Sequence, residues 1–306
     1  MENIYDIVVV GAGPAGMTAA IYGARAGKKT VMIEKDMYGG NIVNAHALEN
    51  YPAIRTITGA EFAKDMYEHA MDLGAEFRWG AVTAVDLEDE EQRIFSAMLD
   101  DGSKIYGRTV IIATGVKNAM GIDREEEMTG KGLSYCATCD GMFFREKQVV
   151  LLGGGNGAIK DAEYLANGCS KVYVAADKFT AADILMDRIS KRDNVELLEG
   201  WKAEELEGDN MIAGVKLINE SGQEKIIDAS GVFVSLGQVP QTNRFSEFLS
   251  LDEKGFADAP EDCKTLVPGV FIAGDCRKKN LRQVVTATAD GAVAASGALS
   301  YLNGRK

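Results

Sequence analysis

Two stretches of the chain repeat one pattern of apolar and polar positions. In the first, an apolar run at residues 6–10 leads through a glycine-rich turn to small and apolar residues at helical spacing over 17–26, and a second apolar run follows at 30–33. The same order returns between residues 148 and 175. Short apolar runs that alternate with a helical pattern are typical of strand–helix–strand units with buried, parallel strands. The pattern therefore predicts an α/β protein that contains two such units.

The turn of each unit has the glycine spacing of a dinucleotide-binding site. Residues 11–16 read Gly-Ala-Gly-Pro-Ala-Gly, and residues 153–158 read Gly-Gly-Gly-Asn-Gly-Ala. In such a motif the first glycine makes a tight turn, the second lets the backbone approach a pyrophosphate at the helix N-terminus, and the third lets helix and strand pack closely. Glu34 follows the first glycine by 23 residues, where a carboxylate accepts hydrogen bonds from ribose hydroxyls. The sequence therefore predicts two dinucleotide-binding, Rossmann-like domains of three layers.

Three further apolar runs end at glycine and support this duplication. Residues 109–115 form a buried strand that ends in Ala-Thr-Gly, and residues 231–237 are its expected counterpart. A third run, residues 269–275, ends at Gly274 and Asp275. We expect the Asp275 carboxylate to bind a polyol hydroxyl of the first ligand, although the spacing alone leaves a solvated turn open.

Composition and charge exclude some classes of protein. The length of 306 residues suits about two domains. The net charge of −13 argues against a general binder of nucleic acids or anionic membranes, which needs a basic surface. The longest uncharged run, residues 7–24, contains four glycines and a proline, so we interpret it as strand, turn and helix rather than as a membrane span. The chain opens with an acid and no base, so we expect no secretory signal and a cytoplasmic protein.

A Cys-x-x-Cys pair, Cys136 and Cys139, lies between the two units. It could be half of a zinc site, a redox dithiol or a pair of unreactive thiols. Zinc needs four nitrogen or sulfur ligands, but there is no second pair and both histidines, at positions 46 and 69, are far off in the sequence, so we expect no metal. A dithiol where a turn enters a helix explains the spacing better, because the helix N-terminus lowers the pKa of one thiol. Asp140 would then donate or accept a proton, or would serve only as a first-turn helix acid.

The other cysteines stand alone in the sequence. An odd number of cysteines in a chain without a secretory signal implies a reducing compartment. We expect each lone cysteine to be a small buried residue of the core. These residues are Cys169, Cys263 and Cys276.

Eight motifs carry a resemblance to one known family. They are Gly-Ala-Gly-Pro-Ala-Gly at 11–16, Tyr-Gly-Gly at 38–40, Glu-Asn-Tyr-Pro at 49–52, Ala-Thr-Gly at 113–115, Cys-Ala-Thr-Cys-Asp-Gly at 136–141, Gly-Gly-Gly-Asn at 153–156, Gly-Asp at 274–275 and Arg-Gln-Val at 282–284. In this order and spacing they resemble the low-molecular-weight flavoprotein thioredoxin reductases over almost the whole chain. The resemblance implies a discontinuous FAD-binding domain, residues 1–116 and 245–306, that encloses an inserted pyridine-nucleotide-type domain, residues 117–244, with the redox pair. It also implies a homodimer.

The resemblance names FAD as the cofactor and assigns residues to it. A helix that begins near Arg282 would favour negative charge on the reduced flavin ring. The FAD-binding residues that it implies are Gly11, Gly13, Pro14, Ala15, Gly16, Glu34, Lys35, Gly40, Asn41, Asn50, Ala113, Thr114, Gly115, Asp275, Arg282, Gln283 and Val284.

The same resemblance implies a reaction in which two electrons pass through FAD and the dithiol to the disulfide of thioredoxin. Cys139 would exchange electrons with the flavin, Cys136 would attack the external disulfide and Asp140 would be the general acid. The phenylalanines at 143–144 would form an apolar docking surface for thioredoxin. Met142 departs from the family pattern, which often has phenylalanine there.

The stretch after the last strand of the second unit departs more strongly. NADPH-using members of the family have His-Arg-Arg-x-x-x-Arg there, which grips the 2′-phosphate, whereas residues 176–182 begin Ala-Asp-Lys and end in alanine. Asp177 would repel a phosphate, and each lost charged hydrogen bond costs about 1.5–3 kcal/mol. A nicotinamide nucleotide is therefore doubtful. The favoured donor is reduced ferredoxin, by resemblance to the ferredoxin-dependent flavin thioredoxin reductases, which lack this clamp.

Other interpretations stay open. NADH could donate electrons if Asp177 bound its ribose 2′-hydroxyl, and NADPH could bind through another site. The protein could also be a flavin dithiol oxidase that passes electrons to oxygen, or a flavin-binding regulatory protein without turnover. The net charge of −13 opposes ferredoxin, since ferredoxins are usually acidic. Residues 277–279 with Arg282 could form a basic docking surface for one, but we interpret them as a solvated loop.

Overall fold

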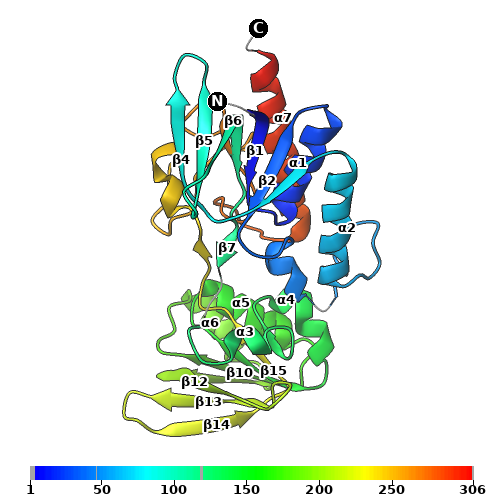
Figure 1. The fold of residues 1–306 in the computed structure, drawn as a ribbon. Coiled ribbons are helices and arrows are strands. Elements are labelled where there is room, and N and C mark those ends of the chain that lie inside the picture. Colours follow the sequence, from blue (N-terminus) through cyan, green and yellow to red (C-terminus); the bar gives the residue numbers. More distant parts are fainter. Residues whose placement is uncertain (1–3, 46, 118–119, 305–306) are drawn as a thin grey trace. The chain divides into compact units, whose positions relative to one another are not determined.

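The computed structural model describes residues 4–45, 47–117 and 120–304, and the chain forms two compact units. Unit 1 consists of residues 1–43, 51–117 and 239–306, and unit 2 of residues 44–50 and 118–238. The chain passes between them through two short strands that pair antiparallel, β7 (Val116–Lys117) and β16 (Val239–Pro240) (Figure 1). Unit 2 is thus inserted into unit 1 in the sequence.

Unit 1 is built on a sheet of seven strands in the order β3-β2-β1-β6-β5-β4, with β17 also paired to β6. The strands are β1 (Tyr5–Val10), β2 (Thr30–Glu34), β3 (Glu76–Trp79), β4 (Val82–Asp89), β5 (Ile94–Leu99), β6 (Lys104–Ile112) and β17 (Val270–Ile272). The pairs that join β3, β2, β1, β6 and β17 are parallel, and β4 and β5 extend the sheet antiparallel. Residues 7–10 of β1 are all buried, which explains why the apolar run is continuous rather than alternating.

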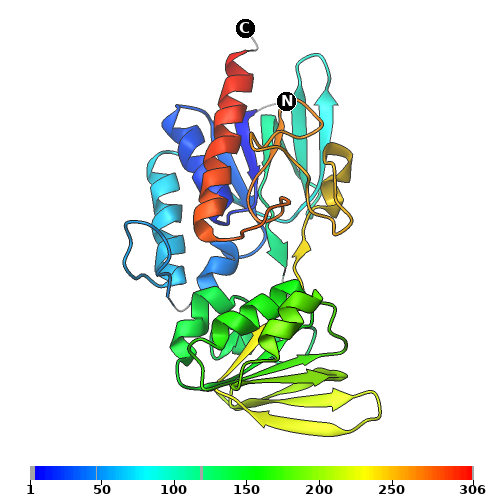
Figure 2. The ribbon, with the colours of Figure 1, turned by 180° about the vertical axis from the view of Figure 1, so that it is seen from behind.

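Three helices and two 3₁₀ segments complete unit 1. Helices α1 (Pro14–Arg25), α2 (Gly59–Asp72) and α7 (Val284–Asn303) pack against one face of the sheet, where α7 (red) lies beside α1 (blue) in Figures 1 and 2. Segment η3 (Asn243–Phe248) packs on the other face with β4 and β5, and η1 (Gly40–Asn44) comes after β2 in the chain. Helices α1 and α7 approach so closely that a Cβ on Gly291 would lie 2.2 Å from the carbonyl oxygen of Ala15.

Unit 2 has a parallel sheet of five strands in the order β11-β10-β9-β15-β8. These are β8 (Leu133–Ser134), β9 (Gln148–Leu152), β10 (Lys171–Ala176), β11 (Val195–Glu199) and β15 (Gly231–Val234). Helices α4 (Ala137–Asp140), α5 (Asn156–Leu165) and α6 (Asp183–Ile189) cover one face. The other face packs on an antiparallel sheet of β12 (Trp201–Glu207), β13 (Gly214–Asn219) and β14 (Glu224–Asp228). The short helices α3 (Glu125–Met128) and η2 (Gly141–Phe144) complete unit 2.

The predicted α/β class with two Rossmann-like units is confirmed. The strands of the two glycine units form within one residue of the predicted runs, but α1 begins three residues earlier than predicted and, like α5, inside the glycine motif. The other predicted runs differ more: β6 spans 104–112 rather than 109–115, β15 ends at 234 rather than 237, and β17 ends at 272 rather than 275. Pro14 opens α1, where its missing N–H costs nothing because the first N–H groups of a helix have no partner within it. No helix of the described residues is long and apolar enough to cross a membrane.

Candidate functional site

The first cradle, residues 11–16, joins β1 to α1 and uses its three glycines differently. Gly11 has φ of +107°, and a Cβ there would lie 2.4 Å from the carbonyl oxygen of Ala113. A Cβ on Gly16 would lie 1.9 Å from the Gly11 oxygen, so both positions need glycine for the fold itself. A Cβ on Gly13 would meet no atom closer than 4.0 Å. Gly13 therefore leaves the backbone open on the side from which a phosphate would approach.

Glu34 ends β2 with its carboxylate turned to the cradle. One oxygen accepts from the N–H of Ala12 at 3.0 Å, and the other accepts from the N–H groups of Lys35 at 2.8 Å and Asp36 at 3.2 Å. The oxygen bonded to Ala12 has a further lone pair with which it can accept a hydrogen bond from a ribose hydroxyl. The Lys35 side chain is exposed and pairs with Asp36 at 3.2 Å.

Asp275 follows β17 and has a buried oxygen. Its Oδ1 has no hydrogen-bond partner among the described residues, and burial raises the pKa of this carboxyl. Arg282 supports the turn, because its Nε donates to the Asp275 carbonyl oxygen at 3.0 Å and its guanidinium lies 4.0 Å from the ring centroid of Phe256. Gln283 is the N-cap of α7, which begins at Val284. The unsatisfied oxygen suits a ligand hydroxyl that arrives from outside the protein.

The structure brings most of the other predicted FAD residues to the same edge of the unit 1 sheet. Gly40 lies against the cradle, since a Cβ on it would be 3.5 Å from the Gly13 Cα. The Asn41 amide donates to the Val116 oxygen at 3.0 Å, and Thr114, just after β6, donates to the Gln241 oxygen at 2.8 Å. Pro14 and Ala15 open α1, and Ala113 and Gly115 flank Thr114. Asn50 belongs to the stretch 44–50 of unit 2, so unit 1 alone does not bring it to the others.

The second cradle, residues 153–158 between β9 and α5, repeats the backbone geometry of the first. Gly153 has φ of +142°, and a Cβ on it would lie 2.3 Å from the Ser235 oxygen. A Cβ on Gly155 would meet only the Thr180 hydroxyl, at 4.0 Å. In both cradles the N–H of the first glycine donates, at 2.8 Å, to the last-but-one residue of the next strand. This shared hydrogen bond places Ala176 at the position that Glu34 holds in the first cradle.

The redox pair forms a disulfide at the start of α4. Cys136 is the N-cap residue, and its Sγ accepts from the backbone N–H of Cys139 at 3.2 Å. Sequence reasoning missed Ser134, a buried residue that connects Cys136 to Asp140. The Ser134 hydroxyl donates to Asp140 Oδ2 at 2.5 Å and accepts from the Cys136 N–H at 3.1 Å. The Tyr135 hydroxyl also donates to Glu125. The acid beside the disulfide is therefore held in place by the fold.

Comparison with known proteins identifies the family. The model of the pyridine nucleotide-disulphide oxidoreductases matches residues 5–291. A thioredoxin reductase of Listeria innocua is 41% identical over 98% of this chain and 95% of its own length, and that of Bacillus subtilis is 39% identical over 98% and 96%. The crystal structure of the Streptococcus pyogenes thioredoxin reductase has a TM-score of 0.91 and 35% identity, and it covers 99% of this chain and 100% of its own. The chain belongs to the thioredoxin reductase family.

Membership in this family makes the protein a flavoprotein disulfide oxidoreductase, as the sequence predicted. The residues present fit FAD, because unit 1 offers an open backbone at Gly13, a ribose-type acid in Glu34 and a buried, unsatisfied oxygen on Asp275. The relatives above carry the plain name thioredoxin reductase, so they do not support the predicted place in a ferredoxin-dependent branch.

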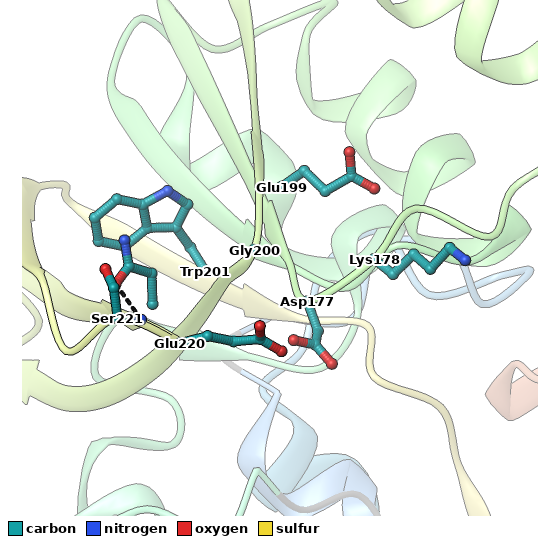
Figure 3. Close-up of a pocket in the computed structure, with 8 residues that line it drawn as sticks. Asp177, Lys178, Glu199, Gly200, Trp201, Glu220 and Ser221 are labelled. Carbon is teal, nitrogen blue, oxygen red and sulfur yellow. Dashed lines mark hydrogen bonds between the residues drawn. The ribbon is translucent and has the colours of Figure 1, made fainter.

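The stretch at residues 176–182 carries one acid, Asp177, and one base, Lys178. A hollow of about 670 Å³ lies beside it in unit 2 (Figure 3). It is lined by Asp177, Lys178, Glu199, Gly200, Trp201, Asn219, Glu220 and Ser221. Its three carboxylates outnumber its one cation, and the Asp177 side chain, 54% exposed, pairs with Lys202 at 3.2 Å. Asp177 follows the position of Glu34 by one residue.

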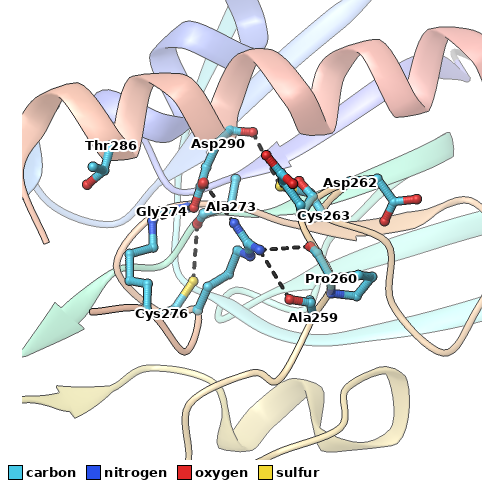
Figure 4. A network of polar contacts seen from close by, with 12 residues as sticks. Ala259, Pro260, Asp262, Cys263, Ala273, Gly274, Cys276, Thr286 and Asp290 are labelled. Carbon is cyan, nitrogen blue, oxygen red and sulfur yellow. Dashed lines mark hydrogen bonds and ion pairs between the residues drawn. The ribbon is translucent and has the colours of Figure 1, made fainter. Parts of the chain in front are cut away.

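The predicted solvated loop at 277–279 is wrong for two of its three residues. Asp290 of α7 accepts from Arg277 Nη1 at 2.7 Å, from Lys279 Nζ at 2.5 Å and from the Gly274 N–H at 3.0 Å (Figure 4). The Arg277 and Lys279 side chains are only 10% and 12% exposed, because the turn folds back onto α7. Only Lys278 reaches solvent. The stretch is therefore not a basic docking surface. The sequence did hold one indication of this burial: Asp290 is the one charged residue of α7, and a lone acid in an apolar helix calls for a basic partner.

The docking surface predicted beside the redox pair is smaller than expected. Phe144 packs inward, with its ring edge to face with Phe233 at 5.2 Å between centroids, because Gly231 opens space for it. Met142 and Phe143 are the exposed apolar residues of this segment, at 62% and 39%.

The three lone cysteines are buried free thiols, as predicted. Burial raises the pKa of Cys169 and Cys276 to about 11 and that of Cys263 to about 12. They therefore remain protonated near neutral pH and unreactive. Within the described part of the chain, no three histidine, cysteine or acidic side chains gather as a metal site would require; His46 of the sequence argument lies outside that part.

Proposed function

We propose that the protein reduces the disulfide of a thioredoxin with two electrons that pass through FAD and the Cys136–Cys139 pair. The observation that carries this proposal is the redox turn itself: an acid, a serine and a backbone N–H are all bonded around a disulfide at the head of α4. By resemblance we extend the proposal to a cytoplasmic homodimer.

The reduced pair would react by thiol–disulfide exchange. Cys136 would attack as the thiolate, since its Sγ accepts the Cys139 N–H, and a hydrogen bond to sulfur favours the charged form. Asp140 would take the proton that Cys136 loses. The Cys136 sulfur would bond to one sulfur of thioredoxin, and the other would leave and take that proton from Asp140. Cys139 would then attack Cys136 Sγ and restore the disulfide, and the second thioredoxin sulfur would leave with the proton that Cys139 loses. Two thiols are oxidised and one disulfide is reduced, so electrons and protons balance.

FAD, when bound, supplies the electron pair that reopens the Cys136–Cys139 disulfide. The first cradle would bind the pyrophosphate of FAD. Glu34 would accept a hydrogen bond from the ribose, and Asp275 would accept one from a hydroxyl of the ribityl chain. The start of α7 at Gln283 and Val284 would lie toward the flavin. Arg282 would keep the Asp275 turn in place through its bond to the backbone.

We propose a reduced protein of the ferredoxin type as the electron donor. Three features of unit 2 support this choice over a nicotinamide nucleotide: Ala176 replaces the ribose acid, Ala182 replaces a clamp arginine, and the neighbouring hollow is acidic. A 2′-phosphate carries about −1.5 to −2 charges near neutral pH and would meet Asp177 there.

Anaerobic mixing with NADPH, NADH and reduced ferredoxin, one at a time, tests the donor through bleaching of the flavin band. We expect fast bleaching by ferredoxin only. Bleaching by micromolar NADPH would overturn the donor proposal. The double variant Asp177→Arg with Ala182→Arg should gain NADPH affinity if the second cradle still accepts a pyrophosphate. Consumption of oxygen with reduced thioredoxin, without net thioredoxin reduction, would favour the dithiol oxidase instead.

A further inference from the structure

A basic hollow lies on the outer face of α5 and α6 in unit 2. Its volume is about 530 Å³. It is lined by Lys160, Glu163, Tyr164, Asn167, Arg188 and Arg192. These residues come from α5, α6 and the turns that follow each helix, and the two helices lie side by side in Figure 1.

The carboxylate of the hollow is already neutralised. Arg188 donates to both oxygens of Glu163, with Nε to Oε1 at 2.7 Å, and the Glu163 side chain is only 16% exposed. Arg192 is positioned by a hydrogen bond from Nη2 to the Asn167 side-chain oxygen at 2.9 Å. Lys160 and Arg192 therefore present two positive charges, in a chain whose net charge is −13.

One wall of the hollow is shared with the redox segment. A Cβ on Gly141 would lie 3.0 Å from Tyr164 Cε1, so this ring packs directly on the backbone two residues after Cys139. The exposed side chains of Met142 and Phe143 follow at once. A partner that brings a disulfide to Cys136 would cover these apolar residues and, beyond Tyr164, would reach the hollow.

We propose that this hollow is part of the docking surface for the disulfide protein, and that the partner is a small acidic protein with carboxylates beside its disulfide. The inference rests on the proposed function. An acidic partner is repelled by most of this chain, so two cations beside the redox segment would both attract it and orient it. Met142 and Phe143 would supply the apolar centre, and the hollow the charged edge.

Charge reversal tests the surface. The double variant Lys160→Glu with Arg192→Glu is compared with the wild type and with a control of two reversals in unit 1, Lys254→Glu with Lys28→Glu, which changes the net charge equally. The measurement is kcat/KM for an acidic thioredoxin divided by that for hydroxyethyl disulfide, from 20 to 500 mM salt. We expect this ratio to fall roughly tenfold at low salt in the hollow variant, mostly through KM, and the difference to shrink as salt screens the charges.

Binding of oxidised thioredoxin, followed by calorimetry, keeps this test separate from that of the proposed function. Loss of binding in the hollow variant alone supports the surface, even if the wild type fails to reduce thioredoxin and the proposed function falls. Equal binding and equal ratios in the wild type and both variants would overturn the surface. Thermal unfolding of each variant controls for misfolding. The milder double variant Lys160→Gln with Arg192→Gln removes the charges without reversing them, and it should lower the kcat/KM ratio by about half as much on a logarithmic scale.

Discussion

Replacing Asp290 by asparagine should destabilise unit 1 and weaken its binding of FAD. Asparagine keeps the shape and one oxygen for the Gly274 N–H, but it removes the charge that Arg277 and Lys279 share. Both cations would stay buried without a counter-charge, since their side chains are only 10% and 12% exposed. The turn that carries Asp275 would keep its hydrogen bond from Gly274 but lose both ion pairs that attach it to α7.

The size of the effect follows from this burial. Removing one partner of a buried ion pair costs about 3–5 kcal/mol. Because asparagine retains one hydrogen bond, we expect the lower end, about 3 kcal/mol. At roughly 2–4 °C per kcal/mol for a domain of this size, the unfolding temperature of the flavin-free protein should fall by about 6–12 °C. A looser Asp275 turn should raise the FAD dissociation constant about tenfold, which corresponds to about 1.4 kcal/mol.

Differential scanning calorimetry and titration of the flavin-free protein with FAD measure the two effects. The matched control is Asp258→Asn, which breaks the neighbouring pair of Asp258 with Lys278 at 3.0 Å, whose side chains are 56% and 54% exposed. An exposed pair of this kind contributes less than about 1 kcal/mol. Equal shifts in the two variants would refute the buried network, and a large loss of stability with unchanged FAD affinity would refute its link to Asp275.

Three other predictions concern the cysteines and Ser134. Cys136→Ser and Cys139→Ser should each abolish thioredoxin reduction yet retain FAD. Only the variant that keeps Cys136 should form a stable mixed disulfide with thioredoxin. Turnover by either variant would contradict the proposed exchange through both cysteines. Ser134→Ala should shift the pH profile of thioredoxin reduction to higher pH, because the Asp140 carboxylate loses a hydrogen-bond donor, and an unmoved profile would show that the serine only supports the turn. After mild reduction at pH 8, iodoacetamide should label two cysteines per native chain, counted by mass spectrometry, since the lone thiols have raised pKa values; a third label would contradict their burial.

Features that depend on backbone constraints could be predicted from the sequence. The strand, glycine turn and helix of each unit follow from apolar runs and from glycines that the fold requires, as at Gly11 and Gly153. The spacing of Cys136 and Cys139 favoured a redox dithiol at a helix start over a zinc half-site or unreactive thiols, but it did not indicate that Ser134 bonds to Asp140 and to the Cys136 N–H.

Contacts between distant segments could not be predicted. Asp290 bonds with Arg277 and Lys279 only because α7 packs beside the end of β17, so a cluster of basic residues that suggested solvent is in fact buried. Phe144 turned inward because of a glycine far along the chain, Gly231. By contrast, counting 23 residues from the first glycine, as from Gly11 to Glu34, already matches Ala176 with Glu34, and the shared hydrogen bond of the two cradles agrees.

The two cradles show which glycines are evidence for a ligand. Gly153 and Gly154 need no ligand to explain them, because a Cβ on either would lie 2.3 Å from a backbone oxygen. Gly155 and Gly157 are free of such contacts, and the next strand, β10, contains no acid. In unit 1, by contrast, Gly13 is open, Glu34 is bonded into the cradle, and Asp275 has an oxygen that no described residue satisfies. A polar group that costs free energy until a ligand arrives is stronger evidence for binding than a glycine that packing requires. On this criterion unit 1 is built for its dinucleotide, and the glycines of unit 2 are explained largely by the fold.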